Sequence, residues 1–398
     1  MQKKRVAIIG TTGLPAKYGG FETLAHHLVD RLNQRFDLTV FCSSKYFSKK
    51  GVRRTHYNGA KLEYLPFNAN GYQSIIYDVI SIVKAMRNND VLLLLGVSGA
   101  ICLPFIKMFS KIPVIVNIDG QEWKRQKWNW IAKKFLGFSE RLAVKYADQV
   151  VADNKVIYDY VVDCYGQNDA SLIEYGSDHV KKVKLTEEAI TKYPFLSGKY
   201  AFNVCRIEPE NNVHVFLDAY AHRPNETLVI VGLWSHNEYG RKLKEYFGEF
   251  SNLHLLDPIY EQEDLDIIRS NASLYLHGHS AGGTNPSLVE AMALGLPVVA
   301  FDVAYNRETT ENVARFFDST LTLHLQLDRL TEAECNSMRV SLENIASKRY
   351  TWGRIADLYA QLFGEDKTLP IVNLTSEASN RNEEIIQIKT QEREEVAA

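Results

Sequence analysis

The stretch SLYLHGHSAGGTNPSLVEAMALGLPVVAF, residues 273–301, contains the pattern that decides the fold. A short apolar run ends at Gly278 and a loop of glycine and polar residues follows. Pro286 then opens a segment with helical apolar spacing, which leads into a second apolar run. Strand, loop, helix and strand in this order predict a parallel β-α-β unit. Glycines just ahead of a helix allow a ligand to approach the backbone closely, so we also expect a binding site here.

The same alternation extends through both halves of the chain. The first half contains the short apolar runs RVAIIG, LTVFC, DVLLLLG and IPVIVNI, with helix-like segments such as Phe21 to Leu32 between them. A second series, KYAFNVC, TLVIVG, NLHLLD, SLYLHG and LPVVAF, begins near Lys199. This alternation predicts an α/β protein with parallel sheets covered on both faces. We therefore expect two facing Rossmann-like domains, with ligands bound in the cleft between them.

A length of 398 residues fits two domains of ordinary size. Charged and turn-forming residues gather over about 171–200, which places the domain boundary there. We expect a first domain over 1–180, a second over 181–349, and a helix over 350–364 that packs near their junction. Residues 365–398 lack aromatic side chains and read as a charged tail.

The charge is divided unevenly along the chain. Residues 1–176 hold 24 basic and 15 acidic residues, a net +9, whereas the remainder has a net −11. A basic first half favours an anionic substrate or an anionic membrane surface near it, and we expect no nucleic acid as a partner.

Cysteine usage and targeting signals favour a cytoplasmic protein. The cysteines, Cys42, Cys102, Cys164, Cys205 and Cys335, form no close pairs, which argues against a zinc site and fits a reducing compartment. No long apolar region follows the opening MQKKRVAIIGTT, so it is not a signal peptide. The most apolar stretch, 91–118, contains prolines and lysines and predicts strand, helix and strand rather than a membrane span.

Two loops of the first half carry candidate chemistry. GTTGLPAKYGGFE, residues 10–22, offers glycines and backbone N–H groups at a helix start, although a tight strand-to-helix turn explains it equally. Its spacing matches neither the dinucleotide nor the P-loop pattern. NIDGQEWKRQKWNW, residues 117–130, combines acids, cations and tryptophans that suit a sugar acceptor, lipid headgroups or a solvated helix start. Asp119 follows a buried strand, so we expect it to point into the cleft as a catalytic residue.

Two loops of the second half complete the predicted site. Arg206 follows the first strand of the second domain and can reach a diphosphate as a forked cation, unless it pairs with Glu208 or Glu210. In the opening stretch, Asn285 is expected to cap the helix and to leave the N–H groups of Ser287, Leu288 and Val289 for an anion. Glu290 can accept hydrogen bonds from ribose hydroxyls or simply favour the helix start. His277 and His279 flank a glycine, and we select His279 as a catalytic candidate.

Taken together, GTTGLPAKYGGFETLAHHL, DGQEWKRQKW, RIEPENN and HSAGGTNPSLVEAMA resemble the retaining glycosyltransferases of family 4, with their GT-B architecture. The resemblance reaches from the N-terminus to Phe363. Within that family it is similar to the branch of bacterial rhamnosyltransferases that build capsule, O-antigen and other cell-envelope polysaccharides. It departs from the wider family at Gly282, where an acid is usual, and at Asn211, where a lysine is usual.

The resemblance implies an acceptor-binding first domain and a nucleotide-sugar-binding second domain. It implies L-rhamnose transfer from dTDP-L-rhamnose to a lipid-linked oligosaccharide, with the enzyme peripheral at the inner face of the bacterial cytoplasmic membrane. Arg206 would contact the diphosphate and Glu290 the ribose. The other donor-binding residues would be Gly19, Gly20, Gly283, Thr284, Asn285, Ser287 and Leu288. The acceptor-binding residues would be Tyr18, Glu122, Trp123, Lys124 and Arg125.

We expect no cofactor and no metal, on the premise that the chain contains no Asp-x-Asp pair to hold a diphosphate through a divalent ion. Two other functions remain open. A nucleotide-sugar 2-epimerase also uses two Rossmann-like domains and would act without an acceptor. A non-catalytic nucleotide-sugar-binding scaffold would fit the missing acid at Gly282.

Overall fold

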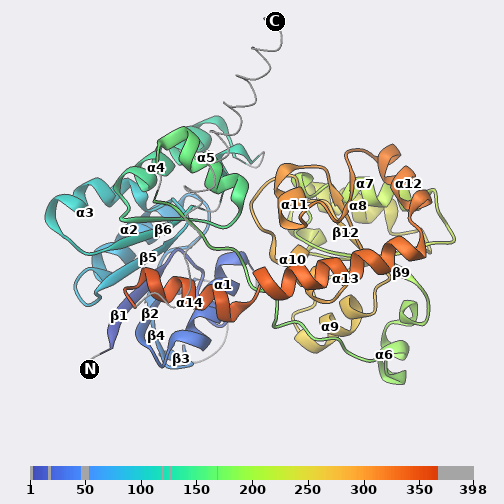
Figure 1. Ribbon diagram of the computed structural model, residues 1–398, viewed down its shortest axis with the longest axis horizontal. Coiled ribbons are helices and arrows are strands. Elements are labelled where there is room, and N and C mark those ends of the chain that lie inside the picture. The colour runs from blue at the N-terminus through green and yellow to red at the C-terminus, as the bar shows by residue number, and fades with distance from the viewer. Residues whose placement is uncertain are drawn as a thin grey trace, which may run out of the picture.

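The computed structural model describes residues 3–16, 19–45, 53–118, 120–125, 128–167 and 169–365. Two sheets lie side by side, and helices cover both faces of each (Figure 1). The predicted α/β class with two Rossmann-like domains is confirmed. All nine apolar runs quoted above form strands.

The first sheet has eight strands in the order β3-β4-β2-β1-β5-β6-β7-β8, and only the pairing of β3 with β4 is antiparallel. Its strands are β1 (Lys4–Ile9), β2 (Phe36–Ser43), β3 (His56–Tyr57), β4 (Ala60–Leu65), β5 (Val91–Leu95), β6 (Val114–Asn117), β7 (Gln149–Ala152) and β8 (Ser171–Leu172). Its helices are α1 (Gly20–Leu32), α2 (Gln73–Ala85), α3 (Leu103–Phe109), α4 (Trp130–Tyr146) and α5 (Lys155–Tyr165). The apolar stretch 91–118 is therefore strand, helix and strand, as expected.

The second sheet has six parallel strands in the order β11-β10-β9-β12-β13-β14. Its strands are β9 (Tyr200–Val204), β10 (Thr227–Val231), β11 (Leu253–Leu256), β12 (Leu274–His277), β13 (Val298–Phe301) and β14 (Arg315–Phe317). Its helices are α6 (Glu187–Lys192), α7 (Val213–Ala221), α8 (Glu238–Phe247), α9 (Gln262–Ser270), α10 (Pro286–Ala293), α11 (Ala304–Thr309), α12 (Thr320–Arg329) and α13 (Glu332–Arg349). The strand order reverses between β9 and β12, and this reversal marks where ligands of such sheets bind.

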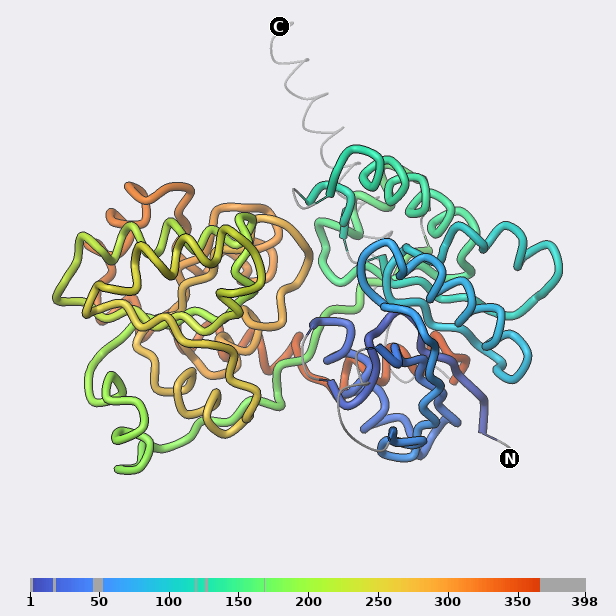
Figure 2. Tube along the Cα trace, turned by 180° about the vertical axis from the view of Figure 1, so that it is seen from behind, coloured from blue at the N-terminus to red at the C-terminus, as the bar shows by residue number. Residues whose placement is uncertain are grey.

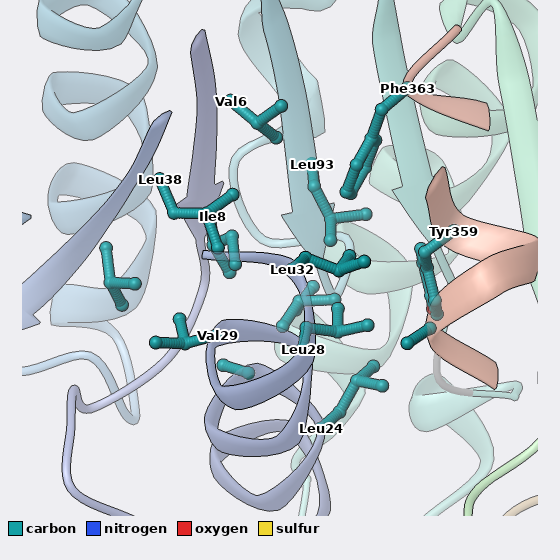
Figure 3. Packing of buried hydrophobic residues seen from close by; sticks show 14 of the residues in the cluster. Val6, Ile8, Leu24, Leu28, Val29, Leu32, Leu38, Leu93, Tyr359 and Phe363 are labelled. Carbon is teal, nitrogen blue, oxygen red and sulfur yellow. The ribbon is translucent and has the colours of Figure 1, made fainter. Parts of the chain in front are cut away.

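The last helix, α14 (Trp352–Leu362), returns to the first domain, as the red segment shows in both views (Figures 1 and 2). Its aromatic side chains enter the core between α1 and the sheet, where Tyr359 and Phe363 lie beside Leu28 and Leu32 (Figure 3). The Tyr359 hydroxyl accepts a hydrogen bond from Asn117 Nδ2 at 3.0 Å. Burial of such rings contributes roughly 1.5–3 kcal/mol each, so this helix ties the two domains together.

The chain crosses between the domains twice, and the two crossings are bonded to each other. The backbone N–H of Ser177 donates to the Tyr350 carbonyl at 2.7 Å, and Asp178 Oδ1 accepts from the Trp352 N–H at 2.7 Å. Within the part of the chain that the structure describes, no helix combines the length and the apolar character needed to cross a bilayer.

Candidate active site

Arg206 and His279 follow the two strands between which the second sheet reverses its order. The Arg206 side chain is exposed, and no described residue forms an ion pair with it. The alternative, a salt bridge of Arg206 with Glu208 or Glu210, is therefore wrong, and the Glu210 carboxylate lies instead 3.7 Å from Arg125 Nη1. The guanidinium lies near enough to Glu22 of α1 to favour ionisation of that carboxyl. Arg206 therefore presents its charge at the cleft.

His279 stacks on His277, with ring centroids 4.6 Å apart and ring planes 11° from parallel. Burial lowers the pKa of His277 to about 3. Burial also holds the pKa of His279 well below its ordinary value, with smaller contributions from His277, Arg206 and Arg125. Both imidazoles are therefore neutral near pH 7, and His279 can exchange hydrogen bonds with a ligand without bringing a charge.

A cavity of about 190 Å³ lies between the two domains. The first domain contributes Gly120, Gln121, Lys124 and Arg125, and the second contributes Glu210, Ser280, Ala281, Gly282 and Tyr305. The two backbones approach closely, because a Cβ on Gly120 would lie only 3.6 Å from the carbonyl carbon of Gly282. Gly282 adopts a φ of +125°, which L side chains rarely accept. The acid that is usual at this position in the resembled family would therefore strain the backbone.

The predicted acceptor residues form one connected loop at the edge of this cavity. Glu122 Oε2 lies 2.5 Å from Arg125 Nε, so these two side chains neutralise each other. Trp123 donates from Nε1 to the buried Glu140 at 3.4 Å, and the Lys124 ammonium lies 5.4 Å from the Trp123 ring centroid. The cavity is thus reached directly by Lys124 and Arg125. Two other predicted residues, Asp119 and Tyr18, lie outside the described residues.

The start of α10 differs from the expectation in one respect. Asn285 does cap the helix, with Oδ1 accepting from the Ser287 N–H at 3.1 Å. The N–H groups of Leu288 and Val289 donate to the Asn285 carbonyl at 3.1 and 3.2 Å. The expectation that these three N–H groups await an anion is therefore wrong, because Asn285 accepts from all of them. This correction removes the basis for placing Ser287 and Leu288 at a diphosphate.

Glu290 lies one turn further along α10 and is held from two sides. Arg269 Nη1 donates to Oε2 at 2.6 Å, and His179 Nε2 lies 3.1 Å from Oε1. Trp352 Nε1 donates to His179 Nδ1 at 3.1 Å, so the ring proton of neutral His179 lies on Nε2 and points to Glu290. Burial alone would raise the pKa of Glu290, but Arg269 and His179 outweigh it and lower the pKa below its ordinary value. Glu290 is a fixed, ionised acceptor.

Each carboxylate oxygen can accept more than one hydrogen bond, so ribose hydroxyls can still bind Glu290. The hollow beside it, lined by Tyr275 and Ser287 among others, measures only about 10 Å³. That volume scarcely holds one water molecule. A nucleoside can therefore occupy this place only if neighbouring side chains move.

Several predicted donor-binding residues lie where the domains touch. A Cβ on Gly283 would lie 1.8 Å from Asp153 Oδ1, so only glycine admits this carboxyl group. The Thr284 hydroxyl accepts from Asn154 Nδ2 at 3.4 Å. On the opposite side, Gly19 has a φ of +114°, and a Cβ there would meet the Glu22 carboxylate at 2.2 Å.

Gly20, the other predicted glycine of this loop, begins α1 beside the Tyr175 ring. A Cβ on Gly20 would lie 3.3 Å from the Tyr175 hydroxyl oxygen. In this structure, the glycines of both loops thus allow side chains of the protein to lie close against the backbone.

The sequence reasoning missed Glu210, His179 and Arg269 as members of the site. Glu210 lies inside the quoted RIEPENN and could have been selected, whereas the other two stand on a linker and on α9 without a local pattern. The premise that the chain contains no Asp-x-Asp pair is wrong, because Asp264 and Asp266 of α9 form one. Its carboxylates pair with Lys192 and Arg269, both at 2.6 Å. Among the described residues, no three His, Cys, Asp or Glu side chains are placed to hold a metal ion.

Two family models match the chain. Residues 3–178 match a domain of unknown function, DUF1972, and residues 187–336 match the family described as Glycosyl transferases group 1. The match to the glycosyl transferases group 1 family thus covers most of the second domain. No curated protein is similar enough to this sequence to count as a match.

Solved structures share the whole fold at low identity. Sucrose-phosphate synthase from Thermosynechococcus elongatus has a TM-score of 0.76 at 16% identity, over 91% of this chain and 99% of the other. HepE of Anabaena in complex with UDP-glucose has a TM-score of 0.67 at 16% identity, over 90% and 99%. An Escherichia coli structure entitled trehalose-6-phosphate, bound with UDP-2-fluoro glucose, has a TM-score of 0.67 at 10% identity, over 91% and 100%. These similarities show the GT-B architecture.

Proposed function

We propose that the protein is a retaining glycosyltransferase that takes a sugar from a nucleotide-diphosphate donor without a divalent ion. The observation that carries the proposal is Arg206, an exposed cation without an ion-pair partner among the described residues, at the reversal of strand order. A charged leaving group is stabilised best by a hydrogen-bond donor that is already in position before the reaction. One such donor commonly contributes roughly 3 to 4 kcal/mol. Arg206 would serve the departing nucleoside diphosphate in this way.

Other residues take supporting roles in this proposal. Glu290 would accept the ribose hydroxyls, and its position is already fixed by Arg269 and His179. The transferred sugar would lie near Gly283, Thr284 and Asn285, with His279 as a neutral hydrogen-bonding group. Asp119 would orient or deprotonate the acceptor hydroxyl.

We further propose dTDP-L-rhamnose as the donor. The UDP-sugar complexes of HepE and of the E. coli protein support a nucleotide-sugar donor for this fold. The rhamnose assignment rests on the resemblance of the sequence motifs.

The acceptor in this proposal is a lipid-linked oligosaccharide of bacterial surface polysaccharide synthesis. Lys124 and Arg125 at the cavity edge would meet its anionic diphosphate end or its first sugars. The reaction would then take place on the cytoplasmic face of the membrane.

A thermal-shift panel of nucleotide sugars tests the donor. A ligand that binds only the folded protein raises the unfolding midpoint by mass action, by several degrees when it is present at about 100 times its Kd. We expect dTDP-L-rhamnose to raise the midpoint more than dTDP-glucose, UDP-glucose or GDP-mannose. A larger shift with UDP-glucose would refute the rhamnose assignment, and no shift with any nucleotide sugar would refute the proposed function. Conversion of a nucleotide sugar without any acceptor would instead favour a 2-epimerase.

A further inference from the structure

The outer helices of the first domain expose an unusual set of side chains. On α3 every exposed residue is a large apolar one: Phe105, Met108 and Phe109. Phe109 exposes 81% of its surface. A helix that merely covers a sheet turns polar side chains to water. The outward face of α3 is instead suited to an apolar environment.

The neighbouring helix α4 adds cations to the same pattern. Its exposed residues are Trp130, Ile131, Lys134, Phe138, Arg141 and Lys145. The last five recur at three- and four-residue intervals, so they form a single stripe along the helix. The Lys134 ammonium lies 5.1 Å from the Trp130 ring centroid. Exposed apolar and cationic side chains on one stripe are typical of helices that lie at a lipid headgroup layer.

Acidic groups are withdrawn from this surface. The helices α2, α3 and α4 contain two acids, Asp78 and Glu140, and both are buried. Glu140 accepts hydrogen bonds from the Tyr160 and Tyr165 hydroxyls at 2.7 and 2.8 Å. Asp148, just beyond α4, pairs with Lys107. The exposed charge of these helices is therefore positive throughout.

Helix α8 of the second domain shows that this composition is not general. Its exposed residues are Glu238, Arg241, Lys242, Glu245 and Tyr246, a mixture of both charges with one aromatic side chain. Such a mixture is ordinary for a surface in water. Helix α8 therefore differs from α3 and α4 in the surroundings that its exposed side chains suit.

We propose that the outer face of α3 and α4, which we call the lipid face, docks on a membrane of anionic lipids. The aromatic and aliphatic side chains enter the headgroup layer, while Lys134, Arg141 and Lys145 pair with lipid phosphates. This inference rests on the proposed function only in that the acceptor is lipid-linked.

The lipid face leads to the cavity along the chain. Trp130, which begins α4, follows five residues after Arg125, and Arg125 lines the interdomain cavity. In Figure 1, α3 lies at the end of the first domain that is farthest from the second. Helix α4 begins next to the acceptor loop and ends next to α3, where Asp148 pairs with Lys107. A lipid-anchored glycan presented along α4 would therefore meet the acceptor loop.

Vesicle flotation with the full chain tests the proposal. We expect wild type to float at low salt with phosphatidylglycerol–phosphatidylcholine vesicles and to remain unbound with phosphatidylcholine alone. The charge variant Lys134→Glu/Arg141→Glu and the apolar variant Phe109→Ser/Trp130→Ser should each reduce binding at least about tenfold. The matched variants on α8, Arg241→Glu/Lys242→Glu and Tyr246→Ser, should bind as wild type does. These side chains are exposed, so all four variants are expected to fold.

Failure of wild type to float, or equal flotation of all variants, would overturn the proposal. A dimer that dissociates in Phe109→Ser/Trp130→Ser would also overturn it, because a second copy would then cover the face. The nucleotide-sugar thermal shift, measured on each variant, separates this test from the proposed function. A retained shift without flotation refutes the lipid face alone, whereas flotation without a shift for any nucleotide sugar refutes the proposed function and leaves the lipid face standing.

Discussion

The glycine-rich loops that open α1 and α10 hold their glutamates in opposite ways. Glu290 of α10 is kept ionised by Arg269 and His179, which lower its pKa despite burial. Among the described residues, no arginine or histidine side chain bonds to Glu22 of α1, and burial raises its pKa although the Thr12 N–H donates to it at 2.7 Å. The difference indicates an acceptor for hydroxyl groups on one side of the cleft. On the other side, burial makes the charged form of the Glu22 carboxyl group less favourable than it is in water.

Arg206 lies between these two loops, and its removal should have the largest effect. We expect Arg206→Ala to lower turnover with dTDP-L-rhamnose at least about a hundredfold, because the leaving diphosphate loses its forked cation. Initial rates at saturating donor measure the loss. Arg241→Ala on α8, an exposed arginine away from the cleft, is the control and should be normal. Near-normal turnover in Arg206→Ala would remove this residue from the mechanism.

Gly283 tests whether the α10 loop must lie against the first domain. A Cβ there would stand 1.8 Å from Asp153 Oδ1, so Gly283→Ala must displace the buried Asp153 carboxyl group or the loop itself. Displacements of about 1 Å cost up to a hundredfold in rate, and we expect a loss of about tenfold or more.

The control for Gly283 is Gly353→Ala on α14, where a Cβ would meet nothing within 4 Å. Its turnover and its unfolding midpoint should match wild type or exceed it slightly. If Gly283→Ala were as active as Gly353→Ala, the contact between the loops would have no part in the reaction.

Paired substitutions of the two glutamates separate their roles. Glu290→Gln replaces an ionised acceptor by a neutral one, and charged hydrogen bonds are worth about 1.5 kcal/mol or more. We therefore expect the donor Kd to rise about tenfold in Glu290→Gln, measured by calorimetry. Glu22→Gln should change the donor Kd less. Equal effects of the two substitutions would contradict the comparison.

The smallest expected effect is on the pH dependence of stability, where the two glutamate variants should deviate from wild type in opposite directions. The pKa of Glu22 is raised in the folded state, so its contribution to stability is fully present below about pH 4.5, the ordinary pKa of the group. This contribution is lost as the pH rises through the folded-state pKa. The unfolding midpoint of Glu22→Gln should therefore fall less than that of wild type between pH 4.5 and neutrality.

Glu290 has a lowered pKa, so its contribution is present above pH 4.5 and is lost as pH falls through the lower folded value. Glu290→Gln should accordingly lose less stability than wild type on acidification. The two variants must deviate from wild type in opposite directions. Parallel pH profiles would show that the two carboxyl groups are held alike.

Strand patterns were readable where the strands are buried. The run DVLLLLG became β5 because a parallel strand covered on both faces is apolar throughout. The strands β3, β8 and β14 were missed, since two or three residues hardly show a pattern, and the longer strands β4 and β7 were missed as well. Arg206 and His279 were found because each follows a buried strand directly.

His179 and Arg269 could not be found in the same way. His179 lies in the linker and Arg269 on α9, and neither neighbours Glu290 in the chain. The direction of the Asn285 side chain could not be predicted either. A capping side chain can accept from the N–H groups of its own helix, or it can turn away and leave those N–H groups to a ligand. Contacts across long chain separations depend on packing that no local pattern records.

The order of apolar runs and turn residues by itself determined the two parallel sheets, because the periodicity of burial is a local property of the chain. Only the tertiary structure decided that Glu290 is held by Arg269 and His179, and that Arg206 is left without an ion-pair partner among the described residues. The physical reason is that charge pairing acts through space. It is decided by which side chains the two domains bring within a few ångströms of each other.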